Sequence, residues 1–142
     1  MKENRNALDE LNKGTTMGMD AIKFILDKVE DKSFKKILKE QYNKYDEISK
    51  KVNELYEEYS EKEPHETNTM EKAMTWSNVQ MQTMNDKSNS KIAEMLLQGT
   101  NMGIIEGRKL LNNKLLDKKV SKLIEEFVSM QEECVEILKE YL

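Results

Sequence analysis

Sulfur-containing side chains are the first candidates for chemistry in this sequence, which has ten methionines and a single cysteine, Cys134. Met130 precedes Cys134 by four residues, so both sulfurs would lie on one face of a helix, about one turn apart. Thioether and thiolate sulfurs are ligands that suit Cu(I). Methionine also fills irregular space in protein cores without any metal. A Cu(I) site is therefore one interpretation, and core packing is the one we favour.

Other arrangements for catalysis or metal binding are missing from the sequence. The one histidine, His65, lies beside Pro64 in a polar stretch. We find no nucleophile with a base, no phosphate-binding loop and no zinc cluster. Glu106 lies nearest to an apolar stripe, about 70° from its centre, and a boundary residue paired with a lysine explains it more simply. We predict no catalytic residue, cofactor or metal site, and lean towards a protein that is not an enzyme.

Composition indicates a helical protein. The 142 residues suit one domain, and 35% charged and 37% hydrophobic residues with 5 Gly and 1 Pro are typical of long helices. The net charge is −4, and basic residues alternate with acidic ones, which disfavours a nucleic-acid partner. We expect no membrane partner, because no run is long enough to span a bilayer. The absence of a signal segment and the single cysteine favour a cytoplasmic location.

Hydrophobic periodicity predicts four long helices, over residues 4–30, 33–61, 90–113 and 117–142. Short turns would make each consecutive pair an antiparallel hairpin. Between the pairs, Pro64 stops the second helix, and Asn68 with Glu71 has the spacing of a capping box. A shorter helix is therefore predicted from about residue 69 to 86. The sequence leaves open whether DKSNS, residues 86–90, breaks this helix or continues it.

The two hairpins are similar in sequence at a fixed offset of 85 residues. LNKGTTMGM at 11–19 corresponds to LLQGTNMGI at 96–104, and the register continues without a gap into the second helix of each hairpin. This similarity favours an internal duplication. It predicts a single domain made of hairpin repeats at 4–61 and 90–142, joined by a crossover at 62–89.

Four glycines recur in the two repeats, four residues apart in each. They are Gly14 and Gly18 in the first repeat and Gly99 and Gly103 in the second. Glycine inside a helix costs about 1 kcal/mol relative to alanine, so a steric reason is expected. We predict that the helices at 4–30 and 90–113 cross closely at these glycines. Alternatively, the glycines relieve crowding beside Tyr42 and Phe127, or leave a small-molecule pocket with Tyr42 and Tyr45 as polar groups.

Two repeated helical hairpins joined by a crossover helix resemble the ferritin-like superfamily, and in particular its small bacterial members. The resemblance covers nearly the whole chain and implies an all-α, ferritin-like four-helix bundle. Active members carry inward carboxylates and a Glu-x-x-His on the second helix of each hairpin, and hold two metal ions. This sequence has no Glu-x-x-His, and its mid-helix inward positions include Thr15, Gly18, Thr100 and Gly103. The resemblance therefore implies the fold without the di-metal chemistry.

The predicted crossover helix has two apolar faces. One contains Met70, Met74, Ser77 and Met81. We expect that stripe to pack on the bundle, with Trp76 about 130° away and with Val79 and Thr83 on the side of Trp76. An outward tryptophan is a common anchor of protein interfaces, although it can also fold into a groove beside a bundle helix.

These features predict a non-catalytic, metal-free helical module that self-associates or binds a protein partner through Trp76, Val79 and Thr83. The alternative function is a metal-handling protein, either a divergent ferritin-like oxidoreductase or a Cu(I) binder. Cys134, Met130 and Glu106 would then be its candidate ligands.

Overall fold

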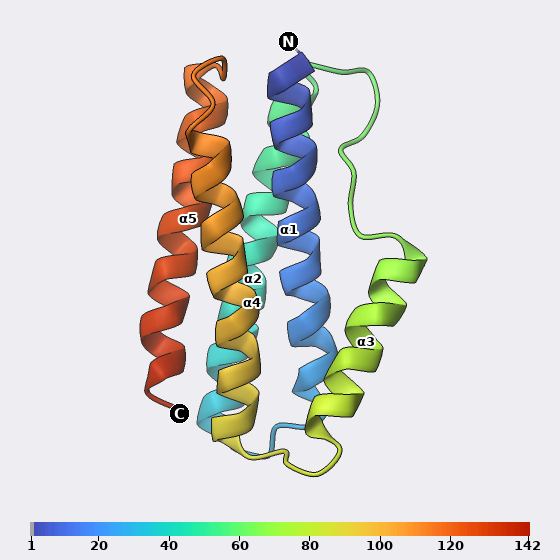
Figure 1. Cartoon of the computed structure of the whole chain (residues 1–142), viewed down its shortest axis with the longest axis vertical. Helices are drawn as coiled ribbons and strands as arrows, with labels where there is room; N and C mark the ends of the chain where they lie inside the picture. The colour runs from blue at the N-terminus through green and yellow to red at the C-terminus, as the bar shows by residue number, and fades with distance from the viewer. Residues whose placement is uncertain (1) are drawn as a thin grey trace.

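In residues 2–142, which the computed structural model describes, five helices and no strand make up the fold (Figure 1). They are α1 (Lys2–Leu26), α2 (Lys32–Tyr56), α3 (Thr69–Thr83), α4 (Asn89–Leu111) and α5 (Lys118–Lys139). The all-α prediction is confirmed, and each predicted helix is present with ends shifted by a few residues. Over this described part of the chain, no helix has an apolar stretch long enough to cross a bilayer.

The four long helices lie side by side, and α3 lies outside them (Figure 1). The hairpins α1–α2 and α4–α5 are each antiparallel, α1 also packs on α4, and α2 also packs on α5. The crossover carries the chain back from the end of α2 to the far end of the molecule. For this reason α2 and α4 run in the same direction. Helix α3 forms most of the return path and packs mainly on α1.

The core forms where the apolar stripes of the four long helices meet. The fully buried apolar side chains include Leu8, Ile25, Phe34, Leu38, Val52, Ile92, Val120, Ile124 and Leu138. Each such side chain contributes roughly 2 kcal/mol through burial. At one end of the molecule the ring of Phe34 stacks on Tyr141, with ring centroids 4.2 Å apart. This contact joins the start of α2 to the segment that follows α5.

Helix starts follow the expected capping chemistry. The Asn68 side chain accepts from the Glu71 backbone N–H at 2.8 Å, and the Glu71 carboxylate accepts from the Asn68 N–H at 3.1 Å, so the predicted capping box is present. The DKSNS segment, residues 86–90, does not continue the crossover helix: α3 ends at Thr83 and α4 begins at Asn89. Ser88 caps α4 by accepting from the Lys91 N–H at 3.1 Å, and Asp86 accepts from the Ser88 N–H.

Helix α5 begins without a cap from its own side chains. Its N-cap residue, Asp117, makes no side-chain capping bond. The Asp117 backbone N–H instead donates to Asn4 Oδ1 at 2.7 Å, and the Asp117 carboxylate accepts from the Tyr59 hydroxyl at 2.8 Å. Residues next to α2 and within α1 therefore fix the start of the last helix.

A polar stripe on α1 binds the crossover. Its members are Asp9, Asn12, Thr16 and Asp20, all buried. Residues 64–67, which we call the crossover strap, lie on this stripe. The His65 N–H donates to Asp9 at 2.9 Å, the Asn12 amide donates to the His65 carbonyl at 2.9 Å, and the Thr67 N–H donates to Thr16 at 3.0 Å. The strap's backbone polar groups are satisfied by α1 in this way.

Asp20 connects the strap to α3. Its carboxylate accepts from the Thr67 hydroxyl at 2.6 Å and from the Lys72 ammonium at 2.9 Å. Lys72 also donates to Thr67 Oγ1 at 3.0 Å. A hydroxyl beside an amine can form a nucleophile and base, but this hydroxyl is buried and its proton is donated to Asp20. The cluster therefore holds α3 on the bundle.

The repeated glycines do not mediate the predicted crossing of the 4–30 and 90–113 helices. A Cβ added at Gly18 would lie 2.7 Å from the Tyr45 ring on α2, and one at Gly103 would lie 2.5 Å from Gln131 on α5. A Cβ at Gly14 or Gly99 would meet nothing within 4 Å. Each crowded glycine therefore faces the second helix of its own hairpin.

The alternative explanation for the glycines was relief of crowding beside Tyr42 and Phe127, and the structure agrees with it at Phe127 but not at Tyr42. Phe127 lies 3.5 Å from the Cβ position of Gly103, as that alternative expected, but Tyr45 rather than Tyr42 faces Gly18. The space left by Gly18 receives a buried ring whose hydroxyl donates to Gln131 Oε1 at 2.6 Å. This hydrogen bond links α2 to α5 in the core.

Candidate functional site: an exposed methionine face on α3

Helix α3 is turned opposite to the sequence-based expectation. Val79 and Thr83, predicted for an outward interface, are each 2% exposed, so they cannot form an exposed contact surface. Met74 and Met81, predicted to pack on the bundle, are each 66% exposed. Trp76 is 51% exposed and lies at the edge of the buried face.

The polar contacts of α3 determine this orientation. Lys72, Val79 and Thr83 share one face of the helix at spacings of seven and four. Lys72 is held by the buried Asp20, and Val79 and Thr83 then pack inwards. Lys13 of α1 also lies 3.6 Å from Glu71 at the start of α3. The ion pairs at the first turn thus fix which of the two apolar faces is covered.

The uncovered face has the spacing of a helix-pairing surface. We define the α3 methionine face as Met70, Met74, Ser77, Met81 and Met84, all of which are exposed. They follow one another at intervals of four, three, four and three, the a/d pattern with which helices pack in coiled coils. Residues 73–85 contain no charged side chain, in a chain with 35% charged residues. From Met74 onwards the face therefore offers exposed methionine side chains with uncharged residues on either side.

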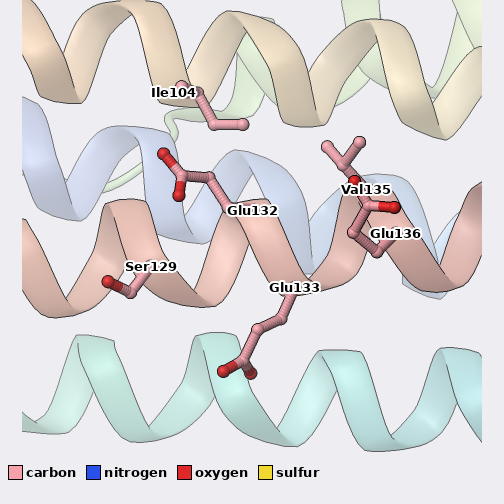
Figure 2. A pocket seen from close by; sticks show the side chains of 6 residues that line it. All are labelled: Ile104, Ser129, Glu132, Glu133, Val135 and Glu136. Carbon is pink, nitrogen blue, oxygen red and sulfur yellow. The ribbon is translucent and has the colours of Figure 1, made fainter.

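Pocket-like hollows elsewhere are shallow and lie at the surface. One of them, about 550 Å³, is an open groove between α4 and α5 lined by Ile104, Ser129, Glu132, Glu133, Val135 and Glu136 (Figure 2). The three carboxylates are each within 4 Å of a basic nitrogen, on Arg108, Lys44 and Lys139 respectively. Figure 2 shows Glu132 and Glu133 pointing to opposite sides of α5. The groove therefore does not gather its charges around a ligand.

The two tyrosines considered for a small-molecule pocket are separated. Tyr42 lines a second surface hollow with Lys23, Leu26, Lys39 and Asn43. Tyr45 is 4% exposed and is bonded to Gln131 in the packed core. Neither of these two hollows is lined by both tyrosines, so neither could present both hydroxyls to one ligand.

The sulfur pair predicted from the sequence is formed in the core. The Cys134 thiol donates to Met130 Sδ at 3.7 Å, and both residues are buried. Glu106, the third candidate ligand, is exposed and lies 3.5 Å from Lys109. Met17 and Met102, the equivalent methionines of the repeats, are exposed as well. Within residues 2–142 no three His, Cys, Asp or Glu side chains are grouped so that they could hold a metal ion.

Cys134 should make the protein less stable at alkaline pH. Burial, assisted by Glu133, raises the pKa of its thiol to about 11, although Lys44 opposes the shift. Burial also raises the pKa of Tyr59 to about 12, together with its hydrogen bond to a carboxylate. Because the folded pKa exceeds the unfolded value, the Cys134 contribution is complete below pH 9.0 and is lost as the pH rises through about 11.

We expect the free energy of unfolding to fall by about 2 kcal/mol from this group between pH 9 and 11. Urea unfolding at a series of pH values would measure the slope. Cys134→Ala serves as the comparison, because it removes only the thiol's share of the pH dependence. Equal slopes in the two proteins would contradict the prediction.

The site and fold define an all-α protein in which one helix, set outside four long ones, exposes an uncharged apolar face. Comparison of the chain with protein-family models, with curated proteins and with solved structures gave no match. The geometry of α3 is therefore the feature from which function can be inferred.

The sequence signal for this face is the scarcity of charge beside the methionine stripe, which hydrophobic periodicity alone does not register. A solvated helix face in a chain this rich in charge normally carries Lys and Glu. An apolar a/d stripe that lies mostly inside a charge-free segment is consistent with a surface that is covered by another helix.

Proposed function

We propose that this protein is a helical interaction module whose α3 methionine face binds a helix of another protein chain. The observation that carries the proposal is the set of exposed methionines at a/d spacing, of which Met74, Met81 and Met84 lie in a segment without charge. Methionine is flexible and polarizable, and it is common on surfaces that bind amphipathic helices. This proposal replaces the interface of Trp76, Val79 and Thr83, with Trp76 retained as a neighbour at the edge.

We also propose a ferritin-like scaffold for this module. Parallel α2 and α4, the α1–α4 contact and a crossover that contains its own helix support that connectivity. In this proposal the mid-bundle positions that could hold inward carboxylates are filled by Thr15, Thr100, Tyr45 and Gln131, which are buried. The scaffold would then serve to present α3 rather than to bind two metal ions.

A photo-crosslinking residue at Ser77 would test the proposed function in cells that make the protein. Ser77 is exposed and lies at the centre of the face. We expect one discrete crosslinked species, whose second chain is identified by peptide mapping. Adding Met74→Lys and Met81→Lys should lower its yield at least ~10-fold, because two charges would be placed in an apolar contact.

The control is the same crosslinking residue at Glu125, an exposed position of α5. The probe at Glu125 should give no crosslinked species whose yield changes when Met74 and Met81 are replaced by lysine. The α3 substitutions are at exposed positions and should leave the helix content unchanged by circular dichroism. A Ser77 probe that gives no more product than the Glu125 probe would rule out the interaction.

A further inference from the structure

We infer that the occupant of the α3 methionine face is a second copy of this chain, which packs α3 against α3 across a two-fold axis near Ser77. This inference rests on the proposed function and names its partner. A two-fold interface brings one patch against itself, so the patch must be self-complementary. The α3 methionine face meets this requirement in its charge, in its residue order and in its extent.

Charge is the first requirement. Around a two-fold axis every charge near the axis faces a like charge, which costs energy. The positions that flank the stripe, equivalent to e and g of a heptad, are Glu71, Ala73, Asn78, Gln80 and Asn85. Only Glu71 is charged; it lies at the end of the stripe, away from the axis, and its carboxylate accepts from the Asn68 N–H and lies 3.6 Å from Lys13. The four positions nearer the axis bring no like charges together. A partner selected by charge would instead require Lys or Glu at these positions.

Residue order is the second requirement. Along the helix the face has two methionines, Ser77 and two more methionines, so it is nearly the same in both directions. An antiparallel pair therefore places methionine against methionine on both sides of the axis. It also places the N-terminus of each helix beside the C-terminus of the other, where the helix dipoles attract. We accordingly assign the antiparallel arrangement.

Extent is the third requirement. The chain exposes 8715 Å². A compact folded monomer of 16.7 kDa exposes about 7,600 Å² by the usual scaling with mass. The surplus of about 1,100 Å² belongs to the whole molecule, whose long helices lying side by side also raise its exposed area. An interface of standard size takes ~800 Å² from each partner. The outlying α3 contributes to that surplus with its exposed Met70, Met74, Met81 and Met84.

Sedimentation equilibrium of the purified protein tests the inference. Between about 5 and 500 µM, a range that covers weak dimers, the mass should rise from 16.7 kDa towards twice that value. The Met74→Lys/Met81→Lys variant should raise the dimer dissociation constant at least ~100-fold, because four like charges meet at the axis. Met17→Lys/Met102→Lys adds the same charge at exposed methionines of α1 and α4, and should leave the constant unchanged.

Single cysteines test the orientation, since the native Cys134 is fully buried. With oxidised glutathione added as the oxidant, Ser77→Cys should form a disulfide dimer with itself. Met70→Cys should pair with Met84→Cys in a mixture of the two variants but not with itself, because equivalent residues lie about 20 Å apart in an antiparallel pair. Self-pairing of Met70→Cys would overturn the antiparallel assignment.

The outcomes separate this inference from the proposed function. A wild-type mass of one chain at the highest concentration would overturn the second copy as occupant. A dimer unaffected by Met74→Lys/Met81→Lys would also overturn it, because the contact would then lie elsewhere. If either result were accompanied by a Ser77 crosslink to a different protein, the proposed function would stand. If the Ser77 probe also gave no crosslink, both the inference and the proposed function would be wrong.

Discussion

Replacing Asp20 by alanine is expected to lower the free energy of unfolding by about 3 kcal/mol. Its carboxylate is buried and accepts hydrogen bonds from Thr67 and Lys72, so both bonds are charge-assisted. Alanine would leave the buried Thr67 hydroxyl without its acceptor and free Lys72 from α1. These contacts hold the strap and α3. We therefore also expect Asp20→Ala to increase the rate of amide hydrogen exchange in α3 more than in α5.

Urea unfolding with amide exchange by mass spectrometry would measure both effects. Asp20→Asn keeps an acceptor for Thr67 but loses the charge, and should have an intermediate effect. Asp46→Ala is the matched control, because Asp46 forms an ion pair with Lys50 at 3.1 Å on the surface of α2. Such pairs contribute well under 1 kcal/mol. A loss for Asp20→Ala no larger than that of the control would show that the strap is not held by this carboxylate.

Gly18→Ala and Gly14→Ala are expected to change stability in opposite directions. The added methyl at Gly18 would lie 2.7 Å from the Tyr45 ring, which is buried and bonded to Gln131. Overpacking of this kind costs ~1–3 kcal/mol, and a displaced hydroxyl would leave Gln131 unpaired at a similar cost. After the gain of ~1 kcal/mol in helix propensity, we expect a net loss of about 3 kcal/mol.

At Gly14 the added methyl would meet nothing within 4 Å, so only the gain in helix propensity remains. We expect Gly14→Ala to raise stability by about 1 kcal/mol. Gly99→Ala should do the same, because the equivalent position of the second repeat is equally open. Thermal unfolding of the three variants would show the signs directly. Stabilisation by Gly18→Ala would contradict the steric role assigned to that glycine.

Much of the helical architecture could be predicted from sequence, because the four long helices each have one apolar stripe. The Asn68–Glu71 capping box was also predictable, since its chemistry is local. The orientation of α3 was not predictable in the same way. Both of its faces carry apolar residues, and the choice between them depends on Asp20, which is distant in sequence but meets Lys72 in space.

The strap-binding stripe of α1 was missed for a related reason. Asp9, Asn12, Thr16 and Asp20 recur at helical spacing, and polar residues in that pattern normally face water. Sequence periodicity cannot distinguish a polar stripe covered by a chain segment from one covered by solvent. The crowding at Gly18 could be anticipated from sequence. Which tyrosine of α2 lies opposite it could not, because that depends on how far α1 and α2 are shifted along each other, and the structure places Tyr45 there.

The way in which α5 begins bears on how the molecule unfolds. Asn4 of the first hairpin accepts from Asp117 across 113 residues of chain, and Tyr59 donates to the same residue. Loss of the first hairpin would therefore remove both of these partners of Asp117, and loss of the second would leave Asn4 Oδ1 and the Tyr59 hydroxyl without theirs. Loss of structure in one half removes the start of the last helix in the other. The two sequence repeats should accordingly behave as one cooperative folding unit rather than as two independent ones.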